Sequence, residues 1–155
     1  CDSLSVITAH CYPDLIHKSD EQETNDLTKA FNYCISQGKK NIVIVGATGR
    51  REDHTLGNIS LLADYALQAS VQMITNYVVF NAIHGPARFA SFWGQQISVF
   101  AIGTPTPISV EHLVYTPPAE GLNSWWRGSL NEATGNYFVI DTAGPTIVFR
   151  AFEDK

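Results

Sequence analysis

The stretch NIVIVGATGRREDHTLGN, residues 41–58, decides the fold of this 155-residue chain. A short apolar, β-branched run over residues 42–45 is typical of a strand, and the glycine turn Gly46-Ala47-Thr48-Gly49 follows it. A helical pattern then begins near His54. The order of strand, glycine turn and helix predicts a turn that aims backbone N–H groups and a helix N-terminus at an anion.

Charged side chains at the same junction favour phosphate as that anion. Arg50, Arg51, Asp53 and His54 all follow the glycine turn directly. Two glycines after a strand more often just let the chain turn, so the glycines alone indicate phosphate only weakly. Phosphate chemistry is therefore a first hypothesis that needs support from the rest of the chain.

Composition limits the class of protein and its partners. A chain of 155 residues is long enough to bury a core. Its content of 45% hydrophobic and 16% charged residues is typical of a globular protein. No apolar run approaches the roughly 20 residues that a membrane span requires. The net charge of −5, with ten dispersed Lys and Arg residues, argues against a nucleic-acid partner. Three cysteines without CxxC spacing favour a reducing compartment, so we expect a cytoplasmic protein. We also expect that it does not bind membranes, because it lacks an apolar run of that length.

The pattern of expected elements changes midway along the chain. Up to residue 76, helical and strand patterns alternate, as in a parallel sheet covered by helices. We therefore expect an α/β, Rossmann-like parallel-sheet domain over residues 1–76, incomplete here, followed by a small β-sandwich or roll over residues 77–155. The strands expected in the second half are residues 77–83, 87–92, 96–102, 109–115, 137–141 and 146–152.

An acidic segment rich in helix caps precedes the first clear helix. Within residues 19–26, Ser19 and Thr24 are candidate caps, and Asp26 falls at or near the first helical turn. A carboxylate there can simply stabilise the helix through its dipole. The sharper interpretation of Asp26 is a metal ligand, and the spacing alone leaves both interpretations open.

Polar and aromatic residues stand out in the β half, above all the pair Trp125-Trp126. On a strand, adjacent side chains point to opposite faces, so both tryptophans cannot be buried in one core. We expect one of them to meet solvent, a ligand or another subunit. Tyr115, Ser129 and Asn131 are further candidates for a binding site.

Three motifs in the first half together resemble the thiamine pyrophosphokinase family, most closely its bacterial members. Residues 46–56, GATGRREDHTL, resemble the GATGGRxDHTL signature, with Arg50 in place of a glycine. Residues 21–30, EQETNDLTKA, resemble DQxxTDLxKA, with Glu21 for Asp and Asn25 for Thr. The opening Asp2-Ser3 resembles the end of the GDxDS motif.

The second half resembles the same family more weakly. Residues 112–115, HLVY, sit where the family often has GLKY or GLKW, and Ser129 and Asn131 sit where it has a Ser-Asn pair. Family members carry a longer segment before the GDxDS motif, including the first sheet strands. Because Met73 is the only methionine, we expect that an upstream segment is missing here.

The resemblance implies transfer of pyrophosphate from ATP to thiamine, giving thiamine diphosphate and AMP, with Mg²⁺ as cofactor. It implies a homodimer whose active site lies between the subunits. The residue roles it implies are catalysis by Asp26, Arg51 and Asp53; phosphate binding by Gly46, Ala47, Thr48, Gly49, Arg50 and Arg51; Mg²⁺ binding by Asp2 and Asp26; and thiamine binding by Gln22, Tyr115, Trp125, Ser129 and Asn131.

Two other functions remain open. A different ATP-dependent phosphotransferase could use the same phosphate loop on another small alcohol, and it would release ADP in place of AMP. A non-catalytic module could bind thiamine or a nucleotide without turnover. The nucleotide product distinguishes the first alternative, and binding without ATP consumption distinguishes the second.

Overall fold

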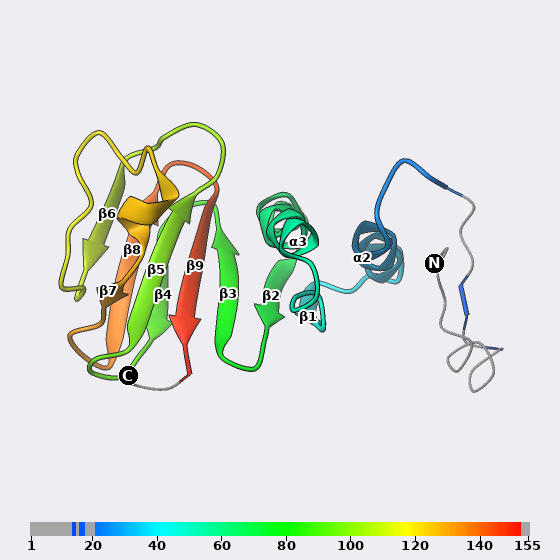
Figure 1. Ribbon diagram of the computed structural model, residues 1–155, viewed down its shortest axis with the longest axis horizontal. Coiled ribbons are helices and arrows are strands. Elements are labelled where there is room, and N and C mark those ends of the chain that lie inside the picture. Colours follow the sequence, from blue (N-terminus) through cyan, green and yellow to red (C-terminus); the bar gives the residue numbers. More distant parts are fainter. Residues whose placement is uncertain (1–13, 15, 18–20, 153–155) are drawn as a thin grey trace. The chain divides into compact units, whose positions relative to one another are not determined.

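The computed structural model describes Asp14, Ile16, His17 and residues 21–152 (Figure 1). Asp2, predicted to bind metal, and Ser19, predicted to cap a helix, lie outside these residues. The chain divides into two units, Cys1–Lys39 and Lys40–Lys155.

Helix α2 (Asp26–Ser36) lies in the first unit, and Asn25 caps its N-terminus. The Asn25 Oδ1 atom accepts the Thr28 backbone N–H at 2.8 Å. The predicted Thr24 cap is wrong, because Thr24 donates its own N–H to the Glu21 carboxylate at 2.8 Å instead. An Asn at the position of the family's Thr therefore keeps an oxygen that stabilises the start of the helix.

The described strands of the second unit form two sheets. A six-stranded sheet has the order β1-β2-β3-β9-β5-β7, and a three-stranded sheet has the order β4-β8-β6. The strands are β1 (Asn41–Val45), β2 (Ser70–Ile74), β3 (Val78–Ile83), β4 (Ala87–Ala90), β5 (Gln96–Ala101), β6 (Ile108–Glu111), β7 (Asn131–Glu132), β8 (Tyr137–Thr142) and β9 (Thr146–Ala151).

The larger sheet is mixed. Strands β1 and β2 run parallel, with helix α3 (Glu52–Tyr65) between them in sequence, as expected for a strand-helix-strand unit. From β2 onward the described strands pair antiparallel, including β2 with β3 across residue 76. The fold is thus mixed α/β with mostly β structure. A Rossmann-like parallel sheet is not confirmed, and the domain boundary at 76/77 stays a prediction.

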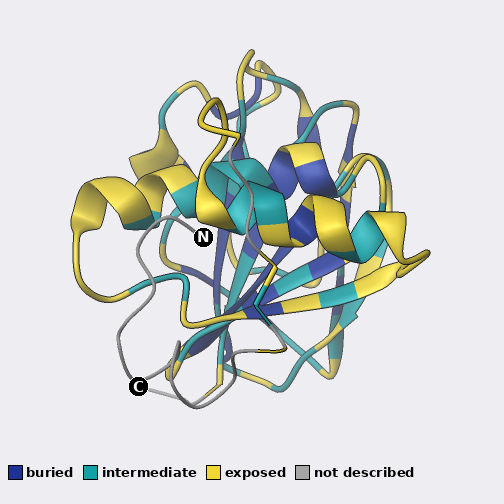
Figure 2. Ribbon diagram, turned by 90° about the vertical axis from the view of Figure 1, so that its right-hand side faces the viewer, coloured by how far each residue is buried: buried dark blue, intermediate teal, exposed yellow. Residues whose placement is uncertain are grey.

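Hydrophobic residues fill the space between the two sheets and the space beneath α3. Phe138, Ile140 and Val148 are fully buried in the core cluster that both sheets share. Helix α3 contacts β2, β3 and β9, and its Leu62 is fully buried, as is Met73 on β2. In Figure 2 the buried residues concentrate on the strands and the exposed ones on loops and outer helix turns.

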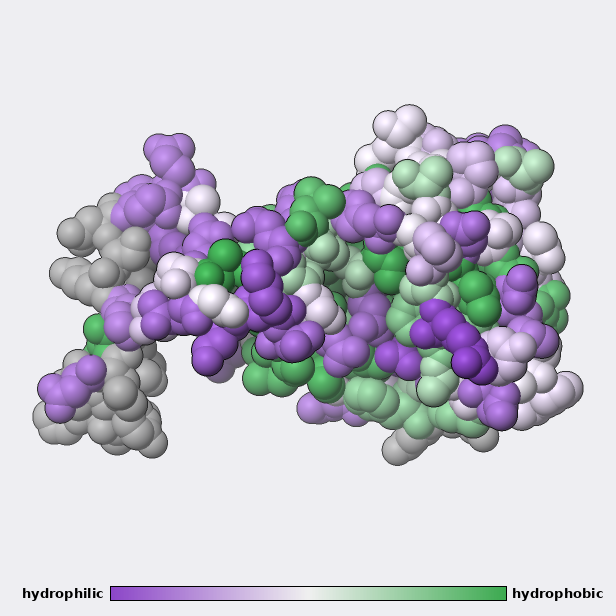
Figure 3. All heavy atoms as spheres, turned by 180° about the vertical axis from the view of Figure 1, so that it is seen from behind, coloured by the Kyte–Doolittle hydropathy of each residue, from purple (hydrophilic) through white to green (hydrophobic). Residues whose placement is uncertain are grey.

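The surface still carries large apolar side chains. Val43 and Val45 on β1, Leu56 on α3 and Tyr77 before β3 are each at least half exposed. Figure 3 shows hydrophobic patches between hydrophilic stretches on the side that faces away from the viewer in Figure 1. Within the described part of the chain, no helix has the length and apolar character needed to cross a membrane.

Gly57→Ala should stabilise the protein, because Gly57 lies exposed inside α3 and a Cβ there meets no heavy atom within 4 Å. Alanine restricts the unfolded chain more than glycine does, so we expect the free energy of unfolding to rise by about 0.5–1 kcal/mol in a urea titration.

Gly38→Ala is the matched control for this prediction. Gly38 follows α2 and also has open space around it, but its φ is 72°, a left-handed conformation that an alanine adopts poorly. This variant should lose about 1 kcal/mol. Equal changes in both variants would contradict the conformational explanation.

Candidate functional site

The glycine turn lies between β1 and α3, so the predicted order of strand, turn and helix is confirmed. Gly46 and Gly49 have φ values of 71° and 107°. A Cβ at either glycine meets no heavy atom within 4 Å, so the turn needs these glycines for their backbone conformation rather than for space. Asn58 of α3 holds the turn in place by donating to the Ala47 carbonyl at 2.8 Å.

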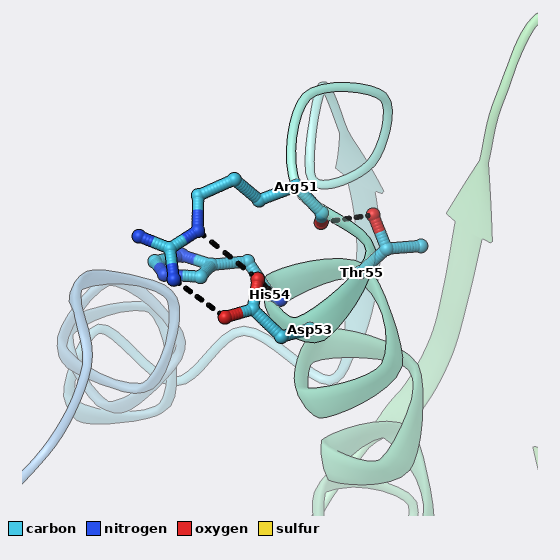
Figure 4. Close-up of polar contacts among 4 residues, drawn as sticks. All are labelled: Arg51, Asp53, His54 and Thr55. Carbon is cyan, nitrogen blue, oxygen red and sulfur yellow. Dashed lines mark hydrogen bonds and ion pairs between the residues drawn. The ribbon is translucent and has the colours of Figure 1, made fainter.

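Arg51 and Asp53 form a forked ion pair at the start of α3 (Figure 4). Arg51 donates from Nε to Asp53 Oδ1 at 3.1 Å and from Nη2 to Oδ2 at 2.6 Å. The His54 backbone N–H also donates to Asp53 Oδ1, at 2.8 Å. Both paired side chains are more than half exposed, so the pair lies open to a ligand. Two of the five guanidinium N–H groups are thus used.

The same pair sets the ionisation of Asp53. Hydrogen bonding from the Arg51 guanidinium, followed by that from the His54 backbone N–H, lowers the pKa of the Asp53 carboxyl below its usual value of 3.8. Asp53 is therefore a charged acceptor at neutral pH, and it orients Arg51. This arrangement does not suit a proton-transferring acid.

The Arg51–Asp53 pair should persist down to strongly acidic pH. A carboxyl with a depressed folded-state pKa stabilises the fold above its unfolded pKa, and this stabilisation is lost as pH falls through the folded pKa. We expect an NMR titration of the Asp53 carboxyl carbon to have its midpoint below 3.8, with Arg51→Ala raising it. A midpoint at or above the usual value in the unmodified protein would contradict the pairing.

Two adjoining cavities surround the glycine turn. The smaller, about 350 Å³, is lined by Gly46, Ala47, Thr48, Arg50, Arg51, His54, Thr55 and Asn58. The larger, about 990 Å³, shares five of these residues with it and continues along apolar side chains of α3 and the six-stranded sheet. Predicted phosphate-binding residues therefore line one connected region. Thr55 and Asn58 were not predicted, because helical periodicity does not reveal which polar residues face a turn.

A separate cavity of about 670 Å³ lies in the β half of the chain. It brings together Tyr115, Ser129 and Asn131, three of the predicted thiamine-binding residues, although Ser129 and Asn131 follow Tyr115 by 14 and 16 positions in the sequence. The complete lining is Val99, Tyr115, Thr116, Pro117, Pro118, Leu122, Trp126, Arg127, Gly128, Ser129, Leu130 and Asn131.

The two tryptophans lie in the 3₁₀ helix η2 (Trp125–Gly128), so the strand alternation that we applied to them is wrong. Trp126 lines the cavity and is 76% exposed. Trp125 does not line it. Its Nε1 donates to the Ala101 carbonyl at 3.2 Å, and its ring lies against Phe100. The helical turn, rather than strand alternation, separates the two indoles.

The Asn131 side chain forms hydrogen bonds with the protein's own backbone. Its Oδ1 accepts the backbone N–H groups of Tyr115 and Glu132 at 3.0 and 2.9 Å, and its Nδ2 donates to the Tyr115 carbonyl at 2.7 Å. The side chain is buried. Asn131 thereby fixes Tyr115 at the edge of the cavity, a role that no sequence pattern revealed.

The remaining predicted residues belong to the first unit. Gln22 and Asp26 are exposed, and Asp26 lies in the first turn of α2, as expected. Both residues belong to the unit Cys1–Lys39, whereas the glycine turn belongs to the unit Lys40–Lys155. Among the described residues, no three His, Cys, Asp or Glu side chains gather as a metal site.

Comparison with protein families gives two adjoining matches. Residues 1–75 match the family model "Thiamin pyrophosphokinase, catalytic domain", and residues 78–149 match "Thiamin pyrophosphokinase, substrate-binding domain". A search of curated proteins gave no significant match.

Solved structures share the fold. A Bacillus subtilis thiamine pyrophosphokinase is 20% identical with a TM-score of 0.74, covering 86% of this chain and 65% of that one. A thiamin pyrophosphokinase from Geobacillus thermodenitrificans is 19% identical with a TM-score of 0.77, covering 96% and 71%. An Enterococcus faecalis protein of the thiamin pyrophosphokinase family is 17% identical with a TM-score of 0.78, covering 99% and 77%. The chain thus spans about two thirds to three quarters of these relatives' lengths.

Proposed function

This chain belongs to the thiamin pyrophosphokinase family, and on that premise we propose that it transfers pyrophosphate from ATP to thiamine, giving thiamine diphosphate and AMP. The observation that carries the proposal is the Arg51–Asp53 pair on the glycine turn. It presents an oriented, exposed guanidinium beside the N-terminus of α3, which suits a polyphosphate.

Pyrophosphoryl transfer depends on positioning and on charge stabilisation more than on covalent chemistry by the protein. In our proposal, the backbone of residues 46–50 and the start of α3 hold the phosphates of ATP. Arg51 donates its outer N–H groups to phosphate oxygens on which charge develops. Asp53 keeps the guanidinium in that orientation throughout the reaction, since it remains ionised.

The family resemblance implies two aspartate carboxylates, those of Asp2 and Asp26, as ligands of Mg²⁺, and carboxylates suit this ion. Asp26 offers an exposed carboxylate at the start of α2, and carboxylate oxygen is the ligand type that Mg²⁺ prefers alongside phosphates and water. We propose Asp26 and Asp2 as its protein ligands. The bound ion would supply neutralisation of phosphate charge.

The cavity of the β half is the proposed thiamine pocket. Thiamine combines a cationic thiazolium with a flat aminopyrimidine, and both suit aromatic faces. Tyr115 and Trp126 provide such faces, and Ser129 provides a hydroxyl. We propose Trp126 as the indole that contacts thiamine in place of Trp125, whose Nε1 is bonded to the Ala101 carbonyl. Gln22 stays a proposed thiamine contact from the first unit.

A homodimer would bring the two halves of the site together. The cavities at the glycine turn and the thiamine pocket have no lining residue in common. We therefore propose that the thiamine pocket of one protomer faces the glycine turn of its partner. We propose the cytoplasm as its location, because three cysteines without CxxC spacing suit a reducing compartment.

The decisive test is to incubate the intact protein with thiamine, ATP and Mg²⁺ and to identify both products by chromatography. Thiamine diphosphate formed in step with AMP would support the proposal. ADP with a thiamine monophosphate would indicate a different phosphotransferase. Thiamine binding without consumption of ATP would indicate a non-catalytic module.

A further inference from the structure

Leu130 has an unusual backbone and an unusual exposure. Its φ is 60°, in the left-handed region, and among the described non-glycine residues only His112 shares this conformation. A branched, apolar side chain is unfavourable there. Leu130 is also 70% exposed, so its side chain adds little to the core of the protomer. The fold by itself therefore gives no reason for a leucine at this position.

The neighbours of Leu130 hold it in place. Its backbone N–H donates to the Ser98 Oγ on β5 at 3.3 Å. On one side, the Ser129 hydroxyl donates to the Trp126 carbonyl at 2.6 Å. On the other side, Asn131 binds the backbone of Tyr115 with two hydrogen bonds. The strained conformation is thus fixed from both sides, as is common at binding sites.

Leu130 lines the cavity in which these same neighbours lie. We infer that Leu130 is a substrate-contacting residue, whose conformation presents an apolar wall to the methyl-bearing rings of thiamine. This inference rests on the proposed function, because it takes the β-half cavity to be the thiamine pocket. The unfavourable backbone conformation persists because the Leu130 side chain contacts the ligand and does not stabilise the fold.

Two substitutions separate the ligand contact from the backbone strain. Leu130→Asn suits the left-handed conformation and removes the apolar wall. We expect its Tm to rise by about 2–5 °C and its Kd for thiamine, measured by calorimetry without ATP, to rise about tenfold. Leu130→Ala retains the unfavourable conformation, so it should weaken thiamine binding similarly without raising Tm.

His112→Asn is the matched control. His112 has the same φ of 60° and is exposed, but it does not line the cavity, and its ring lies against Tyr137. Its Kd for thiamine should match that of the unmodified protein.

Three outcomes would overturn the inference. Unchanged thiamine affinity in Leu130→Asn would refute the contact while leaving the proposed function intact. A changed elution volume for that variant together with unchanged thiamine affinity would assign Leu130 to a subunit contact instead. Absence of thiamine binding by the unmodified protein would overturn the inference together with the proposed function.

Discussion

Arg51→Lys should lower kcat/KM for ATP by about 100-fold or more while leaving the affinity for thiamine unchanged. Lysine keeps the positive charge but has no planar fork. Its three donors lie on a single nitrogen, so pairing with both oxygens of Asp53, as Arg51 does through Nε and Nη2, would leave at most one donor for phosphate. Initial rates at varied ATP, with thiamine binding measured separately, check this expectation.

Asp53→Asn tests whether Arg51 and Asp53 act as a unit. The variant keeps the size of the side chain but loses the charge that orients the guanidinium, so we expect a loss of about 10- to 100-fold. When two residues act together, the double variant loses much less than the product of the single losses. Multiplicative losses would show instead that Asp53 acts independently of Arg51.

Arg88→Lys is the control for a change of arginine to lysine. Arg88 lies on β4, exposed, with its guanidinium 4.0 Å from the Tyr137 ring centroid, and it lines none of the three cavities described above. Its kcat/KM should equal that of the unmodified protein. A similar loss in this variant would mean that the effect of Arg51→Lys does not arise at the glycine turn.

Local patterns predicted the glycine turn well. The apolar run of β1, the glycines and the periodicity of α3 are close in sequence, and each reflects a backbone preference of the residues themselves. The pairing of Arg51 with Asp53 spans only two positions. Short-range interactions of this kind leave a signal that a single sequence carries.

Long-range contacts left no such signal. Strand β7 has two residues, too few to show alternation, and it pairs with β5, which is distant in the sequence. Asn131 bonds to Tyr115 across 16 positions. The aromatic pair Trp125-Trp126 fits a strand by local propensity, but it lies in a 3₁₀ helix that packs against β5. Tertiary packing overrides local propensity at each of these places.

His112 shows how sequence and structure inform each other. It stands where the family's GLKY motif has glycine, and its φ of 60° is a conformation in which glycine is unstrained. A glycine at this position would therefore serve the backbone conformation, and His112 lines none of the three cavities described above. Histidine tolerates the left-handed region better than most residues, so the departure from the motif leaves the turn intact.

Gly128→Ala should destabilise the protein by about 3 kcal/mol or more and abolish the proposed thiamine pocket. Gly128 is buried at the end of η2, where an added Cβ would overlap the Val99 carbonyl oxygen of β5 and lie 2.9 Å from Leu122 Cδ1. Strand β5 pairs with β9 and β7, so its backbone has little freedom to withdraw. The free energy of unfolding in urea measures the loss.

Gly135→Ala separates this steric effect from the general consequences of replacing glycine. A Cβ at Gly135 meets no heavy atom within 4 Å, so its free energy of unfolding should change by less than about 0.5 kcal/mol. If Gly128→Ala proved equally mild, η2 would have to move away from β5. Such a shift would carry Trp126 and Ser129 with it, so thiamine affinity should then fall even in a stable protein. Unchanged stability together with unchanged affinity would mean that the tight contact between η2 and β5 does not shape the pocket.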